Sequence, residues 1–285
     1  MLVCYGTAPV HFHGCRNLIL SLTESISSRS DRAVHNIYVA TDVPGYFSDL
    51  PVNIITLNEK EIEGWLTPAR YHFLIKPRAL LKMLETAPGH FLYLDCDIDL
   101  TRSSFGDLVK HLEDDEKSPK ACLFRCESKV SKARNKSTSI FHDKLFGRGY
   151  PLPSGLFYTY SRSQSQMWGS AMIFLRTKEA ESILRDSIYL AERWVQFIPS
   201  HTIEQFALSE SIRTHGLSIE ALERFVRHFS TSSRKQYAGK TFIGLWGSDI
   251  SSPPVCNAKT RIDPTRPLRS TIHQKLGKWL NNSRS

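Results

Sequence analysis

The sequence predicts an α/β protein in which helices flank a mostly parallel, twisted sheet. Short apolar runs typical of strands alternate with amphipathic runs typical of helices through the first half of the chain. The length of 285 residues is sufficient for a sizeable core. A hydrophobic content of 41% and a charged content of 23% are ordinary for a globular protein. One large domain or two smaller ones would account for this length.

Strands and helices can be placed in order along the first 126 residues. The segment 15–26 repeats its apolar residues at helical spacing. Pro77 suits the first turn of a helix, because proline loses no needed N–H there, and Pro88-Gly89 ends that helix. The expected strands cover residues 2–5, 36–40, 52–57, 91–100 and 121–126. The expected helices cover residues 15–26, 77–85 and 105–112.

The second half is less regular. Residues 127–165 are rich in Ser, Lys and Arg, contain several Gly and Pro, and show no helical or strand period. A stretch of this length without secondary structure is either a functional lid or a disordered insertion, and the sequence leaves both open. Residues 220–229 fit a strand or a short helix. The other expected elements are a strand over 166–176 and helices over 178–194 and 202–213.

The net charge of +9 is concentrated in two segments. Residues 127–165 hold seven Lys or Arg against two acids, and residues 259–285 hold seven against one. Their net charges of +5 and +6 leave the remainder of the chain near −2. Anionic partners are therefore expected at one loop and one tail rather than over the whole surface.

The C-terminal segment has the composition of a linker followed by an amphipathic helix. Residues 270–280 place Ile272, Leu276, Trp279 and Leu280 on one helical face, beside several basic residues. Such a tail fits peripheral contact with an anionic membrane through residues 259–285, and it fits equally a helix docked on the domain. The linker is marked by Pro253, Pro254, Pro264 and Pro267.

The cysteines indicate free thiols. Cys4, Cys96 and Cys122 lie in apolar runs and are expected to be small core residues. No secretory leader opens the chain and no run is long enough for a membrane span, so a reducing cytoplasm is the expected location. A zinc site at His11, His13 and Cys15 is disfavoured, because no second ligand pair follows at finger-like spacing.

The apolar run 91–100 contains three aspartates at alternating positions. On a continuous strand, Asp95, Asp97 and Asp99 would all leave the same face, where unpaired carboxylates repel one another. A bound divalent cation removes that penalty, and hard carboxylate oxygens suit Mn2+ or Mg2+. A strand-end aspartate that caps the next turn would explain one acid but not the pair.

Six segments form an ordered set along the chain: Gly6-Thr7, Lys76-Pro77, Tyr93-Leu94-Asp95-Cys96-Asp97, Met167-Trp168-Gly169-Ser170-Ala171-Met172, Glu204-Gln205 and Arg227-His228-Phe229-Ser230. Together they resemble the GT-A class of nucleotide-sugar glycosyltransferases, closest to its glycogenin and bacterial lipooligosaccharide galactosyltransferase branch. The segment 93–97 resembles the Asp-x-Asp motif of that class. Two acids one residue apart are common, so the ordered set is the stronger signal.

The resemblance implies a metal site and a reaction. Asp97 would be a direct metal ligand, Asp95 would contact the metal, the ribose or both, and His228 would be a third ligand. The ion, Mn2+ or Mg2+, would stabilise the diphosphate leaving group of a nucleoside-diphosphate sugar, with a uridine diphosphate sugar as the expected donor. The acceptor would be a glycan or a lipid-linked saccharide. Asp99 and the run Ser230-Thr231-Ser232 depart from the usual pattern.

The resemblance also implies substrate contacts and catalytic groups. Glu204 could act as a base if the reaction inverts configuration, whereas Gln205 could line the transition state if it retains configuration. The sequence leaves the stereochemistry open. The expected substrate-binding residues are Gly6, Thr7, Arg70, Lys76, Asp95, Gly169 and Ser170.

Residues 1–250 are thus expected to form a GT-A-like catalytic domain, and residues 251–285 a basic linker and tail. A sugar-nucleotide nucleotidyltransferase is an alternative, but it would need a basic, glycine-rich loop after the first strand. Residues 6–11 contain one Gly and no Lys or Arg. A nucleic-acid-binding module is disfavoured, because no aromatic-plus-basic platform and no zinc-finger spacing is present, so no nucleic-acid partner is expected.

Overall fold

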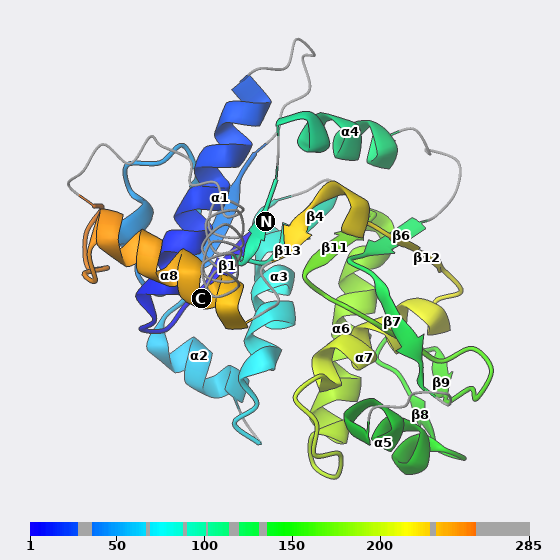
Figure 1. Cartoon of the computed structure of the whole chain (residues 1–285). Helices are drawn as coiled ribbons and strands as arrows, with labels where there is room; N and C mark the ends of the chain where they lie inside the picture. Colours follow the sequence, from blue (N-terminus) through cyan, green and yellow to red (C-terminus); the bar gives the residue numbers. More distant parts are fainter. Residues whose placement is uncertain are drawn as a thin grey trace, which may run out of the picture.

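The α/β class is confirmed by the computed structural model of the chain (Figure 1). The structure describes residues 1–27, 36–66, 69–87, 90–100, 102–113, 120–130, 136–228 and 232–254. The predicted tail 259–285 lies outside these residues.

The N-terminal part is a three-stranded parallel sheet with helices packed beside it. Strand β1 (Leu2–Cys4) pairs with β2 (Tyr38–Thr41), which pairs with β3 (Asn53–Thr56), both in parallel. The helices of this part are α1 (Pro9–Ser27), α2 (Glu59–Leu66) and α3 (Ile75–Thr86). Short 3₁₀ turns occupy Pro44–Phe47 and His72–Leu74.

A four-stranded sheet continues the structure, and the expectation of a mostly parallel arrangement is confirmed. Its strand order is β12-β6-β11-β4, in which β12, β6 and β4 run in the same direction and β11 is antiparallel to its two neighbours. The Leu94 N–H donates to the Met1 carbonyl at 3.1 Å, so β4 lies beside β1 and the two sheets adjoin. The strands are β4 (Phe91–Leu94), β6 (Lys120–Leu123), β11 (Met172–Leu175) and β12 (Ser218–Ala221). Its helices are α4 (Arg102–Glu113), α6 (Thr177–Trp194) and α7 (Ile203–Thr214).

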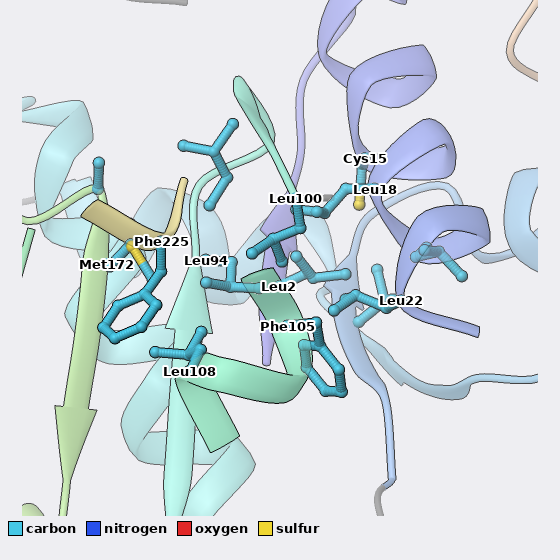
Figure 2. Close-up of a cluster of buried hydrophobic side chains, with 14 of the residues drawn as sticks. Leu2, Cys15, Leu18, Leu22, Leu94, Leu100, Phe105, Leu108, Met172 and Phe225 are labelled. Carbon is cyan, nitrogen blue, oxygen red and sulfur yellow. The ribbon is translucent and has the colours of Figure 1, made fainter. Parts of the chain in front are cut away.

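The adjoining sheets separate two apolar cores, because successive side chains of a strand face opposite sides. Leu2 and Cys4 join one core with α1 and α4, whereas Val3 joins the other with α3, α6 and α7. Figure 2 shows the first core, in which Leu18 of α1, Leu94 of β4 and Leu108 of α4 converge. The strand alternation therefore fixes which of the two cores each strand residue joins.

The expectation that residues 127–165 lack secondary structure is wrong for the part of the segment that the structure describes. That part is folded around a third core, formed in part by Phe141, Tyr158 and Tyr160 with Trp194 of α6 and Phe206 of α7. These aromatic residues stabilise the segment but are not spaced at a helical or strand period. The sequence pattern therefore does not reveal its helix and strands. The elements are β7 (Cys126–Lys129), α5 (Lys136–Leu145), β8 (Gly149–Pro151) and β9 (Phe157–Thr159).

Two further expectations need correction, and one open alternative is resolved. The run 91–100 is not one strand, because β4 ends at Leu94 and β5 (Ile98–Asp99) begins after a turn. The strand over 166–176 is divided into β10 (Gln166–Trp168) and β11. Residues 220–229 hold the end of β12, a 3₁₀ turn (Glu223–Phe225) and β13 (Arg227–His228).

Helix α8 (Ser232–Trp246) was not predicted, and it packs against α1 (Figure 1). Ala238, Phe242 and Trp246 of α8 form a small apolar cluster with Val10 and Leu20 of α1. Among the described residues, no helix combines the length and the apolar character that crossing a membrane requires.

Candidate active site

A cavity of about 580 Å³ opens at the carboxyl ends of β1 and β4. Ligands of open α/β sheets bind at this edge, where the loops after the strands meet. We call this cavity the active-site pocket. Its walls come from the loop after β1, from residues 72–76, from residues 93–97, from the start of α7 and from α8.

One wall of the pocket is a compact polar cluster around Lys76. The Lys76 ammonium donates to Ser170 Oγ at 2.6 Å and lies 2.7 Å from Glu204 Oε1. Ser170 Oγ in turn donates to the same Glu204 oxygen at 2.7 Å. Burial alone would lower the pKa of Lys76, but the Asp95 and Glu204 carboxylates outweigh burial and raise it. Lys76 is therefore a fixed positive charge in the pocket wall.

Asp95 faces this cluster. Its Oδ1 accepts a hydrogen bond from the Tyr93 hydroxyl and lies 4.0 Å from the Lys76 ammonium. Burial raises the pKa of Asp95. The Lys76 ammonium opposes that rise, and the Asp97 carboxylate adds to it. Asp95 is thus held by two partners on the Lys76 side of the pocket.

Asp97 meets His228, although they are far apart in the sequence. His228 Nε2 lies 3.2 Å from Asp97 Oδ1, since β13 pairs with β5 and aligns His228 with Ile98. The Phe124 ring packs edge-on against the imidazole at 5.1 Å between centroids. Both polar side chains are partly exposed, so a cation could reach them.

The three predicted metal ligands do not form one compact group. Across the described part of the chain, the only three His, Cys, Asp or Glu ligand atoms within 4.8 Å of one another belong to Cys4, Cys15 and Cys96. The structure therefore brings Asp97 and His228 together, and it turns Asp95 towards Lys76. Asp99, the third acid of the motif, is 2% exposed and does not share a continuous strand with Asp95.

The loop after β1 forms a further wall of the pocket. Gly6 has a φ of 92°, a conformation that glycine adopts without steric cost, and its N–H donates to Asp42 Oδ2 at 2.9 Å. Thr7 is exposed and lines the pocket beside it. Asp42 follows β2 directly and was not predicted as a site residue, although an acid at the end of a parallel strand is a usable signal.

The first turn of α7 contributes Glu204 and Gln205 to the pocket. Both Lys76 and Ser170 already bond the Glu204 carboxylate, which is 4% exposed. In contrast, the Gln205 side-chain oxygen is buried and has no hydrogen-bond partner among the described residues. A buried acceptor without a partner is rare in native proteins, and it fits a ligand that brings a hydroxyl or N–H group.

Three predicted substrate-binding residues, Arg70, Gly169 and Ser170, do not line the pocket. Arg70 is exposed, has a left-handed φ of 50°, and is absent from the pocket wall. Gly169 is buried, where its N–H donates to the Arg125 carbonyl at 2.9 Å and its carbonyl accepts from the Phe124 N–H at 3.0 Å. Gly169 therefore connects strands, and Ser170 bonds Lys76 and Glu204 without lining the pocket itself.

Aromatic residues complete the pocket, and sequence reasoning missed them. Tyr5, Phe73 and Tyr93 line it, and the Phe73 ring is 46% exposed. The Tyr71 hydroxyl donates to the His201 carbonyl at 2.7 Å and accepts from the Glu204 N–H at 3.2 Å, which fixes the start of α7. The sequence signal that could have identified these residues is their position close to strand ends or close to Lys76 along the chain.

Comparison with known proteins gives only distant likenesses. No protein-family model and no curated protein matches the sequence. A glycosyltransferase involved in glycosylation of the major capsid of PBCV-1 is 11% identical with a TM-score of 0.45, over 85% of this chain and 97% of that one. Mouse xyloside xylosyltransferase 1, in its apo form, is 12% identical with a TM-score of 0.44, over 77% and 83%.

A third similar structure is 4-diphosphocytidyl-2C-methyl-D-erythritol synthase from Anaerococcus prevotii. It is 10% identical with a TM-score of 0.42, over 84% of this chain and 96% of that one. All three TM-scores are below 0.5, so these likenesses do not carry an activity over to this chain.

Proposed function

We propose that this chain is a metal-dependent glycosyltransferase of GT-A type, which moves a sugar from a nucleoside-diphosphate sugar to a glycan or lipid-linked acceptor. The observation that carries the proposal is the contact of His228 with Asp97, which lines the active-site pocket. A carboxylate from the turn before β5 and an imidazole from β13 converge there, beside a second acid and a buried lysine. The uridine diphosphate donor is an expectation from the sequence motifs.

Asp97 and His228 suit Mn2+ or Mg2+, with Mn2+ favoured because it accepts imidazole. Two protein ligands leave most coordination positions for phosphate oxygens and water, which is usual for ions that bind together with a phosphorylated substrate. When bound, the ion would act as a Lewis acid that stabilises the negative charge of the leaving diphosphate. To contact the ion or the ribose, the Asp95 side chain would have to turn away from Lys76.

The protein's own groups would orient the donor. Gly6 and Thr7, in the loop after β1, leave room for the nucleoside, and Lys76 supplies positive charge beside the diphosphate. The free oxygen of Gln205 would accept a hydrogen bond from a sugar hydroxyl. Glu204 would hold Lys76 in place, because its carboxylate is already bonded to Lys76 and Ser170.

This arrangement favours Gln205 over Glu204 as the group that faces the reacting sugar. An inverting reaction would require Glu204 to leave Lys76 before it could accept a proton from the acceptor hydroxyl. Retention of configuration, with Gln205 lining the sugar face, needs no such rearrangement. The acceptor and the role of the basic tail in peripheral membrane contact remain proposals from the sequence.

A thermal-shift panel tests the proposal. The purified chain is melted with UDP, GDP, CDP or ADP, each with Mn2+, Mg2+ or EDTA. A ligand at roughly 100 times its Kd adds about 2.7 kcal/mol of apparent stability, which raises the Tm by about 5 °C or more. We expect this rise for UDP with Mn2+ and not with EDTA.

Asp97→Asn should abolish the metal-dependent shift and sugar transfer while the Tm without ligand stays nearly unchanged. The matched control is Asp143→Asn, which removes an exposed acid outside the pocket and should behave as wild type. A fully active Asp97→Asn enzyme would contradict the proposal. Stabilisation by a nucleoside triphosphate, with pyrophosphate release from a sugar phosphate, would instead identify a nucleotidyltransferase.

A further inference from the structure

Three thiols meet beneath the active-site pocket. Cys4 ends β1, Cys15 lies in α1, and Cys96 occupies the turn between β4 and β5. Their sulfur atoms all lie within 4.8 Å of one another. Cys4 is 2% exposed and Cys15 is fully buried, whereas Cys96 is partly exposed. Figure 2 shows Cys15 on the inner face of α1, within the apolar core.

Two independent contacts hold these segments together. The Cys96 thiol donates to the Val3 carbonyl at 3.4 Å, which ties the turn to β1. Gly14 lets α1 approach the same turn, because a Cβ at this position would lie only 2.5 Å from the Cys96 carbonyl oxygen. The cluster is therefore set by backbone packing on two sides.

We propose that Cys4, Cys15 and Cys96 form a three-thiolate binding site for a thiophilic cation of the Zn2+ class, separate from the site at Asp97 and His228. Zinc–sulfur bonds of about 2.3 Å place the sulfur atoms about 4 Å apart, so the most distant pair needs to close by about 1 Å or less. Soft thiolate ligands select such ions over Mg2+ and Mn2+.

The site has an entry path, because Cys4 and Cys96 line the active-site pocket. Three protein ligands leave one position of a tetrahedral ion open, and a water from the pocket would fill it. On binding, three S–H bonds are replaced by three S–Zn bonds, and three protons leave to solvent. The ion itself undergoes no change of oxidation state, so no further reactant is needed.

Binding would cross-link three segments that are distant in sequence. The ion would join β1, α1 and the turn that carries Asp95 and Asp97. Because it binds the native arrangement, it should raise the Tm, as any ligand selective for the folded state does. The site itself does not depend on the proposed transferase activity.

The experiment uses the full chain, reduced with a phosphine, stripped of metal and titrated with Cd2+ as a spectroscopic substitute for Zn2+. We expect one equivalent to bind, with an ultraviolet thiolate-to-metal absorption, a raised Tm and release of protons. Zn2+ should displace Cd2+, and excess Mg2+ or Mn2+ should not. The thiolate absorption separates this site from binding at Asp97 and His228.

Cys15→Ser removes a direct ligand of the ion. Loss of an outer-shell partner typically weakens metal binding about 10–100-fold, so Cys15→Ser should weaken Cd2+ binding by more than that. The matched control is Cys126→Ser, which removes an exposed thiol outside the cluster and should bind as wild type. If Cys15→Ser fails to fold, Cys96→Ser replaces it, because Cys96 is partly exposed.

Absence of thiolate absorption in the reduced wild type would overturn the proposal. So would unchanged Cd2+ affinity in a folded Cys15→Ser or Cys96→Ser variant. A disulfide between two of these cysteines, with no metal uptake after reduction, would likewise overturn it.

Discussion

The Lys76 ammonium and the Glu204 carboxylate lie 2.7 Å apart in the wall of the active-site pocket. Ser170 bonds both groups, and Asp95 lies 4.0 Å from the same ammonium. The pair thus joins α3 to the first turn of α7 and sets the charge that a bound diphosphate would meet. It also explains why Glu204 is a poor candidate for a free base.

Lys76→Met should destabilise the chain by about 3–5 kcal/mol, because it leaves Glu204 buried and without its cation. The matched control is Lys82→Met on the same helix, which breaks a partly exposed pair with Glu61. That change should cost below about 1 kcal/mol. Urea unfolding measures both free energies, and equal losses would show that the Lys76 pair has no special role.

Gln205→Leu should distinguish a role of Gln205 in donor binding from a role in the stability of the fold. The substitution removes a buried oxygen that has no partner in the described structure, so the unfolding free energy should stay unchanged or rise slightly. If this oxygen accepts a hydrogen bond from the donor, transfer should fall by about tenfold or more, which corresponds to roughly 1.4 kcal/mol. Denaturant unfolding and initial transfer rates provide the two readings. Reduced stability with unchanged transfer would assign Gln205 a structural role instead.

His13 should make stability depend on pH. Its Nε2–H donates to the Gly247 carbonyl at 2.9 Å, and Nδ1 accepts from the Tyr46 hydroxyl, so the buried ring is neutral. Burial lowers the pKa of His13, Arg16 adds to this, and the Gly247 carbonyl opposes it. The unfolded chain therefore binds the proton more readily, since its histidine pKa is about 6.5.

The stabilising contribution of neutral His13 is thus fully present above about pH 6.5 and is lost as the pH falls through the folded-state pKa. The His13→Gln protein should lack this pH-dependent contribution to the free energy of unfolding. Unfolding free energies of both proteins are compared between pH 7.5 and 5, each as a difference from its own value at pH 7.5. Parallel curves for the two proteins would refute the assignment, because other titrating groups are common to both.

The periodic parts of the fold were predictable from sequence. The apolar spacing around Leu18 and Leu22 predicts the buried face of α1, and Pro77 lies in the first turn of α3, as expected. Such signals are local, because each residue's neighbours along the chain determine them. The segment 127–165 was mispredicted since Phe141 and Tyr158 are ordered by contacts with α6 and α7, which no local pattern reveals.

The site was predictable only in part, for the same reason. The acidic motif lies in a loop that lines the pocket, but the pairing of Asp97 with His228 depends on how β13 meets β5. The turn at Cys96 separates Asp97 from Asp95, which stays beside Lys76, whereas a continuous strand would have kept the two acids on one face. Cys4 was correctly expected in the core, whereas its meeting with Cys15 and Cys96 depends on tertiary packing.

Gly14 controls that packing, and Gly14→Ala tests it. Alanine normally stabilises a helix by about 1 kcal/mol relative to glycine. At Gly14 the new Cβ would lie 2.5 Å from the Cys96 carbonyl oxygen, so α1 and the turn must separate. Overpacking of this kind typically costs about 1–3 kcal/mol, so we expect a net loss of stability.

Gly64→Ala is the matched control for Gly14→Ala, because Gly64 also lies within a helix and a Cβ there meets no atom within 4 Å. It should gain about 0.5–1 kcal/mol. Gly14→Ala should also weaken Mn2+-dependent nucleotide binding, since the displaced turn carries Asp97. Urea unfolding and thermal shifts with UDP and Mn2+ measure both effects. A stabilised Gly14→Ala protein with normal binding would show that the close approach of α1 to Cys96 does not constrain the pocket.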